Sequence, residues 1–236
     1  MILFQTDDFY VCEKPAGVSF NDEADAQGWF NQLKAHTQEV LYPVHRLDKV
    51  TSGLIIVARH VNAAAEFTTL FTNKCVEKIY LAMSDQKPKK KQGWVKGDME
   101  KSRRGSWKLL RSQNAPAVTQ FHSEGLVEGK RLFWVSPKTG KTHQIRVALK
   151  SIGAPIFGDP VYGSANQIEA GQPDRCYLHA FALQFEFAGE CYRFALLPND
   201  GSLFQLASLQ ERLHNWIKAE SYVLLSNQSA SFRESS

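Results

Sequence analysis

The sequence predicts an α+β fold built on a mixed, mostly antiparallel central sheet with flanking helices. Two observations support this class. Short apolar or β-branched runs recur along the chain without the regular strand and helix alternation of a parallel α/β fold. Only a few stretches between them carry apolar residues at helical spacing. The chain has 236 residues, 43% of them hydrophobic, which is enough to bury a sizeable core.

The N-terminal part of the chain is expected to form strand, helix, strand and helix in that order. Phe9–Cys12 is a β-prone run that the turn residues of Lys14–Gly17 stop. A polar, helix-compatible stretch runs from about Asp22 to Lys34. Leu54–Ala58 is apolar throughout, which is typical of a central strand buried on both faces. Apolar residues at helical spacing between Val61 and Lys74 predict a second helix.

The remaining strands and helices follow from the same patterns. We expect strands at Ile79–Met83, Val118–Phe121, Leu132–Val135, Tyr177–Phe185 and Tyr192–Leu196. Helices are expected over Thr142–Ile152, with Arg146 on its polar face, and over about Leu206–Lys218. Residues 1–221 are interpreted as a single domain, and 222–236, which are rich in Ser and Asn, as a polar tail.

Several classes of protein are excluded at this stage. No apolar stretch approaches the length of a membrane span, and the N-terminus has no basic segment or cleavage site, so we expect a cytoplasmic protein without membrane partners. The four cysteines and seven histidines are scattered, without metal-ligand spacing. No metal is therefore expected.

The charge of the chain is concentrated in one segment. Ten basic residues and two acidic ones lie between Lys87 and Arg111, although the whole chain carries a net charge of only +4. A basic segment suits a phosphate backbone, whose counterions Lys and Arg displace, but it is equally typical of a solvated loop. Gly93, Gly97 and Gly105 within it favour hairpin turns.

The densest cluster of functional side chains lies directly before the Leu54 strand. His45-Arg46-Leu47-Asp48 is followed by Thr51-Ser52-Gly53, whose hydroxyls can satisfy loop amides. Asp48 is the candidate reacting group, because a loop held by a rigid strand can keep a carboxylate in one pose. Taken alone, the motif is also compatible with a turn in which Asp48 only bonds to the backbone.

Several blocks in order along the chain resemble the RluA-type family of RNA pseudouridine synthases. The early turn, the H-R-L-D-x-x-T-S-G segment, a K-x-Y strand and three later blocks carry the resemblance, and together they span most of the chain. These blocks are Lys14–Gly17, His45–Gly53, Lys78–Ala82, Lys141–Arg146, Gly153–Gly163 and Leu178–Ala180. The resemblance implies the pseudouridine synthase fold and an isomerase that converts uridine in RNA to pseudouridine without a cofactor.

The resemblance also implies roles for three catalytic residues. Asp48 would be the catalytic aspartate, acting as a nucleophile or by stabilising positive character at C1′ and moving protons. Arg146 would pair with it and keep it ionised, and the alternative for Arg146 is a helix-surface cation. Tyr80 would stack on the uracil or transfer a proton, whereas a strand tyrosine alone is more often a core residue.

Further residues are expected to contact the RNA. Arg46 would enter the RNA as the target nucleotide flips out, and His45 would support the loop or touch phosphate. The segment that contains Lys101, Arg103 and Arg104 falls where relatives carry RNA-contacting strands. At position 141 this chain has Lys where many relatives have Arg, so Lys141 belongs to the expected contact set. Ala148 replaces a histidine of many relatives, and both departures affect contacts near the target base.

The expected partner is structured RNA, a tRNA or rRNA stem-loop, bound by a monomer. No S4-like module precedes Lys14, so substrate choice is expected to depend on the catalytic domain. A noncatalytic RNA-binding protein of the same fold is the first alternative. A glycoside hydrolase is the second, although that chemistry generally requires two cooperating carboxylates and only Asp48 has a supporting motif.

Overall fold

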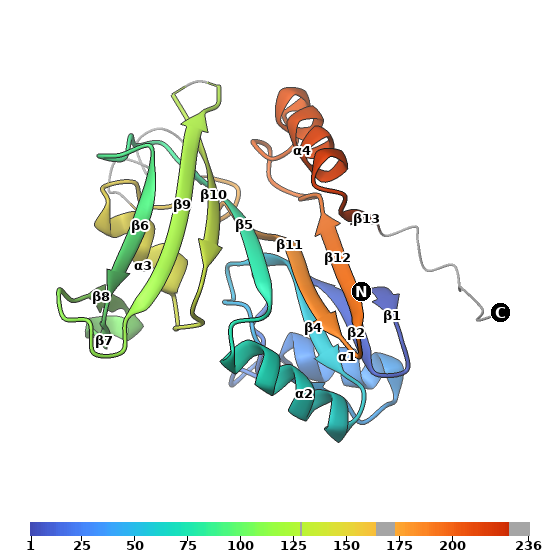
Figure 1. The fold of residues 1–236 in the computed structure, drawn as a ribbon. Helices are drawn as coiled ribbons and strands as arrows, with labels where there is room; N and C mark the ends of the chain where they lie inside the picture. The colour runs from blue at the N-terminus through green and yellow to red at the C-terminus, as the bar shows by residue number, and fades with distance from the viewer. Residues whose placement is uncertain (128, 164–172, 227–236) are drawn as a thin grey trace. The chain divides into compact units, whose positions relative to one another are not determined.

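The computed structural model describes residues 1–127, 129–163 and 173–226 (Figure 1). The chain forms two compact units. Unit 1 comprises Met1–Val76, Phe181–Pro198 and the residues from Gln210, and unit 2 comprises Glu77–Ala180 and Asn199–Leu209. Each unit is therefore assembled from segments that are distant in the sequence.

The sheet of unit 1 is built around a strand that is buried along its whole length. Strand β4 (Ser52–Ala58) pairs antiparallel with β2 (Phe9–Lys14), which in turn pairs with β1 (Ile2–Gln5). The two-residue strand β3 (Tyr42–Pro43) pairs with the end of β4. Every residue of β2 and β4 is buried, which explains why the Leu54 run is continuously apolar rather than alternating.

Three further strands complete this sheet. Strand β11 (Leu178–Phe187) follows β4 in the strand order and pairs antiparallel with β12 (Glu190–Leu196). Strand β13 (Val223–Leu225) pairs parallel with β12, so the sheet is mixed. Val223–Leu225, assigned to the polar tail from the sequence, are thus part of the sheet. Of the expected tail, 227–236 lie outside the described residues.

An aromatic core packs against helix α2 (Val61–Thr72), as the apolar spacing predicts. The ring of Phe67 lies 5.4 Å from that of Phe9 and 4.7 Å from that of Phe187. At the N-terminus of α2, the His60 side chain accepts a hydrogen bond from the amide of Ala63 and so caps the helix. This packing holds β4, and with it the chain that enters β4, in a rigid frame.

Helix α1 (Trp29–Thr37) begins later than the sequence suggests. The Asp22 carboxylate accepts a hydrogen bond from the Gly28 amide at 2.7 Å, which closes 22–28 into a loop. A Cβ at Gly28 would lie 2.2 Å from the backbone carbon of Asn21, so the loop also needs glycine there. Burial of Trp29 and Leu33 then fixes the helix, whereas the polar residues before Trp29 bury nothing.

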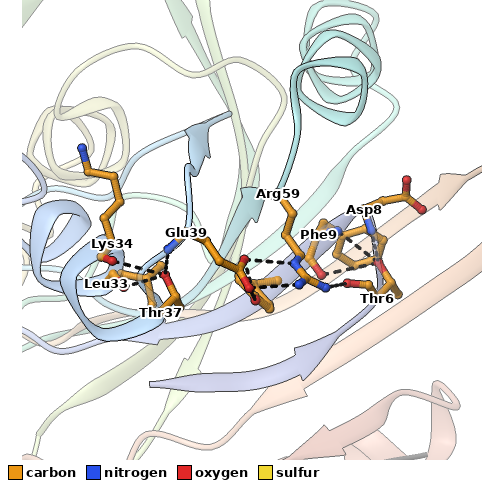
Figure 2. Close-up of polar contacts among 9 residues, drawn as sticks. Thr6, Asp8, Phe9, Leu33, Lys34, Thr37, Glu39 and Arg59 are labelled. Atoms are coloured by element: carbon orange, nitrogen blue, oxygen red, sulfur yellow. Dashed lines mark hydrogen bonds and ion pairs between the residues drawn. The ribbon is translucent and has the colours of Figure 1, made fainter. Parts of the chain in front are cut away.

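A polar network ties the far end of β4 to its neighbours (Figure 2). Arg59, directly after β4, pairs with Glu39 at 3.0 Å and donates to the carbonyl of Thr6 at 2.6 Å. Glu39 also accepts from the hydroxyl of Tyr10 at 2.9 Å. The hydrogen bond from Arg59 outweighs burial and lowers the pKa of Glu39. The network joins three loops at one end of the unit 1 sheet.

Unit 2 contains a four-stranded antiparallel array. Strand β5 (Glu77–Ser84) pairs with β10 (Arg131–Pro137), which pairs with β9 (Ala117–Gly125), which pairs with β6 (Gln92–Gly97). The short strands β7 (Met99–Lys101) and β8 (Trp107–Leu109) form a separate hairpin, whose connection includes a tight turn at Arg103–Gly105 (Figure 1). The glycine-rich basic segment therefore forms strands and turns, as expected.

Two helices remain, α3 (Gln144–Ser151) and α4 (Ala207–Ala219). Helix α3 packs on β9 through Gln144, whose side chain donates to Thr119 Oγ1 at 3.0 Å. It begins after His143, which has a left-handed φ of 57° and so cannot continue the helix backward to Thr142. Helix α4 matches the helix expected near Leu206–Lys218.

The expected fold class is confirmed: the fold is α+β, with mixed, mostly antiparallel strands and flanking helices. All four cysteines are free thiols, and Cys12 and Cys176 are buried. Within the described ranges, no helix is both long and apolar enough to span a membrane. In the same ranges, no cluster of three or more acidic, histidine or cysteine side chains is arranged to hold a metal ion.

Candidate active site

The loop that carries Asp48 connects β3 to β4 in unit 1. Asp48 is half-buried, and its carbonyl accepts a hydrogen bond from the amide of Thr51 at 3.0 Å, which closes a tight turn. Thr51 and Ser52 are buried where the loop enters β4. Because β4 is fixed by packing on both faces, this turn holds the Asp48 backbone in a defined position.

Lys14, the last residue of β2, anchors the same loop. Its side chain is fully buried, and Nζ donates to the carbonyls of Thr51 at 2.9 Å, Pro15 at 2.8 Å and Lys49 at 3.4 Å. The amide of Gly17 adds a hydrogen bond to the Lys49 carbonyl at 2.8 Å. The sequence placed Lys14 in a turn and gave it no role in the site. The signal that could have found it is a lysine that closes a buried, largely apolar strand, where a charge needs a dedicated partner.

His45 supports the loop from within. Its Nε2 accepts a hydrogen bond from the amide of Ile56 in β4 at 2.8 Å, and its ring lies 4.8 Å from that of Phe71. This is the loop-supporting role, one of the two roles expected for His45. Arg46, the next residue, is exposed, so its guanidinium faces solvent beside the turn.

In unit 2, Arg146 is buried and paired with Asp159. Arg146 Nε lies 2.7 Å from Asp159 Oδ2, and a terminal nitrogen of the guanidinium lies 2.9 Å from Oδ1, so the contact is bidentate. The guanidinium carbon also lies 4.9 Å from the ring centre of Tyr162. The prediction that Arg146 lies on the polar face of its helix is therefore wrong, and with it the alternative of a surface cation. Helical periodicity predicts that a charged side chain faces solvent unless it has a buried partner. The partner of Arg146 is Asp159, 13 residues later in the chain, so the local pattern does not reveal it.

Asp159 is the buried carboxylate that pairs with Arg146. Burial on its own would raise the pKa of the carboxyl group, but hydrogen bonds and charge from Arg146 lower it further than burial raises it. The amides of Val161 and Tyr162 donate to Oδ1 at 2.9 and 3.0 Å and act in the same direction. Asp159 is thus ionised at neutral pH and fixes the position of the Arg146 cation.

The hydroxyl of Tyr162 links three parts of unit 2. It accepts a hydrogen bond from the amide of Trp107 in β8 at 2.7 Å and lies 3.0 Å from Nδ1 of His143 at the start of α3. The Tyr162 ring is buried and packs against Arg146. The basic hairpin β7–β8 is therefore attached to the same side chain that packs on the Arg146 guanidinium. Tyr162 lies in the Gly153–Gly163 block of the sequence, and the motifs predict no separate role for it.

Tyr80 lies on the face of the unit 2 sheet that α3 covers. It pairs with Val135 in β10, which pairs with Phe121 in β9, two residues from Thr119, the side chain that α3 contacts. Lys78, two residues before Tyr80, shares this face, and burial followed by the charge of Lys138 lowers its pKa. Unit 2 thus brings Tyr80 and the Arg146 helix to one side of its sheet.

The expected RNA-contacting cations of unit 2 are on its surface. Lys101 ends β7, Arg103 and Arg104 form the turn of the hairpin, and all three are exposed. Arg104 adopts a left-handed φ of 54°, so the turn presents its side chain in a constrained direction. Lys141 is also exposed, three residues before α3, and Ala148 is buried within α3.

The expected residues therefore fall into two sets. Asp48, Arg46 and His45 lie in unit 1, where the structure brings them onto one anchored loop. Tyr80 and Arg146 lie in unit 2, on one side of one sheet. The contact between Asp48 and Arg146 stays a prediction.

Comparison with known proteins places this chain in one class, that of the RNA pseudouridine synthases. The family model described as RNA pseudouridylate synthase matches residues 8–151. A Haemophilus influenzae RNA pseudouridine synthase is 42% identical over 92% of this chain and 95% of its own length. Ribosomal large subunit pseudouridine synthase C of Rickettsia bellii is 33% identical over 69% of this chain, which spans only 56% of that longer relative.

A solved structure agrees with the sequence matches. Human RNA pseudouridylate synthase domain containing 1 superposes with a TM-score of 0.73 at 25% identity, over 96% of each chain. The chain belongs to the RNA pseudouridylate synthase family. It is an RNA pseudouridine synthase, an isomerase that converts uridine in RNA to pseudouridine.

Proposed function

We propose that Asp48 is the catalytic residue of this synthase and that Arg146 and Tyr80 act with it on a flipped uridine. The observation that supports Asp48 most directly is its anchoring. The buried Lys14 ammonium donates to two carbonyls of the Asp48 loop, those of Lys49 and Thr51, and a backbone turn completes the hold of the loop against a rigid strand. Preorganisation of this kind is what a reacting carboxylate requires, because a small displacement costs a large part of the rate.

Arg146 is proposed to bind Asp48 as a second carboxylate. A guanidinium pairs with carboxylates through two parallel N–H···O bonds and stays charged at every accessible pH. An arginine that a buried aspartate already fixes in place can hold a reacting carboxylate ionised without reorganising. Tyr80 is proposed to supply a ring that stacks on the uracil or a hydroxyl for proton transfer.

The proposed carboxylate, guanidinium and phenol can together supply the chemistry that the reaction requires. The bond between C1′ and N1 of uridine breaks, the uracil turns within the pocket and a bond from C1′ to C5 forms. C5 gives up its proton and N1 takes one up, so the net change is an isomerisation. A carboxylate can attack C1′ or stabilise its positive character and accept protons. We propose that neither metal nor cofactor takes part.

The proposed substrate is a structured RNA, a tRNA or rRNA stem-loop. The name of the Rickettsia bellii relative supports rRNA, because it states action on the large ribosomal subunit. We propose that Arg46 enters the stack as the target base leaves it, with His45 fixing the loop and Lys141 contacting RNA beside the site. Exposed Lys101, Arg103 and Arg104 suit the phosphate backbone on the hairpin. We further propose that the catalytic region, which with β13 extends past the expected end at residue 221, acts as a monomer in the cytoplasm.

The role of Asp48 is tested with Asp48→Asn and Asp48→Ala. We expect tritium release from RNA labelled at C5 of uridine to fall below detection, while RNA affinity stays within a few-fold. Asp25→Asn is the matched control, because Asp25 is an exposed aspartate of the same unit. Wild-type release by either Asp48 variant would remove Asp48 from the mechanism. Mass mapping of pseudouridine in cellular RNA with and without the gene then identifies the RNA.

A further inference from the structure

One face of the unit 2 sheet carries two tryptophans and is exposed along β6 and β9, whereas Leu81, Met83 and Leu132 on the same face are buried. In β6, Trp94 pairs with Gln120 of β9, and Gln92 pairs with His122, which in turn pairs with Trp134 of β10. Residues that pair directly across antiparallel strands project from the same face. We call this the tryptophan face; its residues are Gln92, Trp94, Lys96, Gln120, His122 and Trp134.

The tryptophan face is the reverse of the face that carries the candidate catalytic residues. Helix α3 contacts Thr119, and successive side chains of β9 alternate between faces, so Gln120 and His122 point away from α3. Tyr80 shares the α3 side, because its pairing partner Val135 faces Phe121. The tryptophan face is thus distinct from the surface already described.

The two tryptophans are presented to solvent in different ways. Trp94 is 51% exposed, although it is the largest type of apolar side chain. Trp134 is half-buried and its ring nitrogen donates to Glu124 at 3.1 Å, which holds the indole in one orientation. They lie on the two strands that flank β9, about 10 Å apart across the sheet. Each can therefore present a ring to a separate base.

One cation lies on the tryptophan face. Lys96 Nζ lies 5.5 Å from the ring centre of Trp94, a cation–π contact at the edge of the sheet. The exposed lysines that precede β6 run beside the other face, because the amide of Lys89 donates to the carbonyl of Ile152 at the end of α3. Glu124, the acidic residue beside Trp134, is engaged by the indole nitrogen. The surface therefore combines positive charge with aromatic rings, which is the chemistry of a single-stranded nucleic acid platform.

We propose that the tryptophan face binds an unpaired segment of the substrate RNA, whose bases stack on Trp94 and Trp134 while a phosphate contacts Lys96. The inference rests on RNA being the substrate and does not depend on Asp48. It gives the enzyme a second contact with RNA outside the reacting nucleotide, and so a means of preferring targets with unpaired flanking sequence.

The test compares two substrates, the target stem-loop alone and the same stem-loop extended by an unpaired oligouridine tail. Trp94→Ala is expected to raise KM for the extended RNA about 5- to 100-fold, the range that one stacked base supplies, with kcat unchanged. KM for the bare stem-loop should not change. Trp94→Phe should restore most of the affinity, because phenylalanine keeps a π face. Val40→Ala, which shortens an exposed apolar side chain of unit 1, is the control.

Three results would overturn the proposal. One is equal KM values of Trp94→Ala and wild type on the extended RNA. Another is the same loss on both RNAs, which would indicate a fold defect. The third is a wild-type protein that sediments as a dimer and a Trp94→Ala variant that sediments as a monomer, which would make the face a protein interface. Failure of the Asp48 proposal is distinguishable, because Asp48→Asn would then release tritium from both RNAs as the wild type does, while Trp94→Ala would still raise KM for the extended RNA alone.

Discussion

At the scale of single residues, Lys14 shows how a buried charge can position a loop. A fully buried ammonium is costly unless its three donors are used, and here they reach two carbonyls of the Asp48 loop and one of the neighbouring Lys14–Gly17 turn. The hydrogen bonds that offset the burial of the Lys14 charge are therefore the same ones that order the Asp48 loop. Removing the ammonium leaves those carbonyls without their donor.

We predict that Lys14→Met lowers both stability and turnover. Leaving buried carbonyls unsatisfied costs about 1–3 kcal/mol of unfolding free energy. The loosened loop should lower kcat at least about tenfold, because the Asp48 carboxylate loses its fixed pose. Urea unfolding and tritium release measure the two effects, with Lys218→Met as the exposed control. A variant with normal kcat would show that loop order does not limit the reaction.

Tyr162 is the second residue with a positioning role, because its hydroxyl contacts the Trp107 amide and His143. Tyr162→Phe keeps the ring against Arg146 but removes the acceptor for the Trp107 amide and the contact with His143. We predict weaker RNA binding through a displaced hairpin, seen as KM raised several-fold with a smaller change in kcat. Tyr192→Phe, which removes a hydroxyl bonded to an exposed glutamate, is the control. An unchanged KM would mean that the hairpin needs no attachment at β8.

At the scale of elements, the β7–β8 hairpin separates its structural and binding residues. Its strands pair through Met99 and Leu109 at one end and Lys101 and Trp107 at the other, while the turn between them is exposed and basic. The attachment to Tyr162 uses a backbone amide and not a side chain. The cations of the turn are therefore not needed to hold the hairpin in place.

We predict that Lys101, Arg103 and Arg104 changed together to Ala weaken RNA binding and flatten its salt dependence. Each phosphate contact contributes about 0.7–0.9 to the slope of log affinity against log salt, so loss of all three lowers the slope by about 2–3. Unfolding free energy should stay within about 0.5 kcal/mol, as for exposed substitutions in general. Binding measured from low to moderate salt gives the slope, and an unchanged slope would reduce the hairpin to a solvated loop.

At the scale of the whole molecule, stability is expected to fall at alkaline pH. Burial raises the pKa of the Cys12 thiol to about 12, and burial followed by the hydrogen bond to Glu39 raises that of Tyr10 to about 12. Both groups lie in β2, the buried strand beside β4. Each stays protonated in the folded chain while the unfolded chain ionises, so their stabilisation is complete below the unfolded pKa values and is lost between about pH 8.5 and 12.

The alkaline loss is measured by urea unfolding between pH 7 and pH 10.5. One thiol that ionises only on unfolding contributes a slope of about −1.4 kcal/mol per pH unit once the unfolded group is fully titrated. Cys12→Ala should remove this part of the slope near pH 9, whereas Cys75→Ala should not, because Cys75 is exposed. Equal slopes for the wild type and Cys12→Ala would show that the thiol ionises without unfolding.

Most of the elements were predictable because their signals are local. The apolar run at β4, the helical spacing of α2 and the strands β5, β9 and β10 each follow from residues within about ten positions of one another. The start of α1 was not predictable from composition. It depends on the Asp22 contact with Gly28 and on which residues of the stretch find a core to bury.

The sequence by itself determined the class of fold, the family and the identity of the candidate catalytic residues, since ordered motifs are properties of the chain. Only the tertiary structure decided that Arg146 is buried, because its partner Asp159 lies across a turn from the helix. It also decided that Lys14 anchors the Asp48 loop and that Tyr162 joins the hairpin to α3. A hydrogen bond between segments far apart in the chain leaves no periodicity in the sequence, and only folding brings its two ends together.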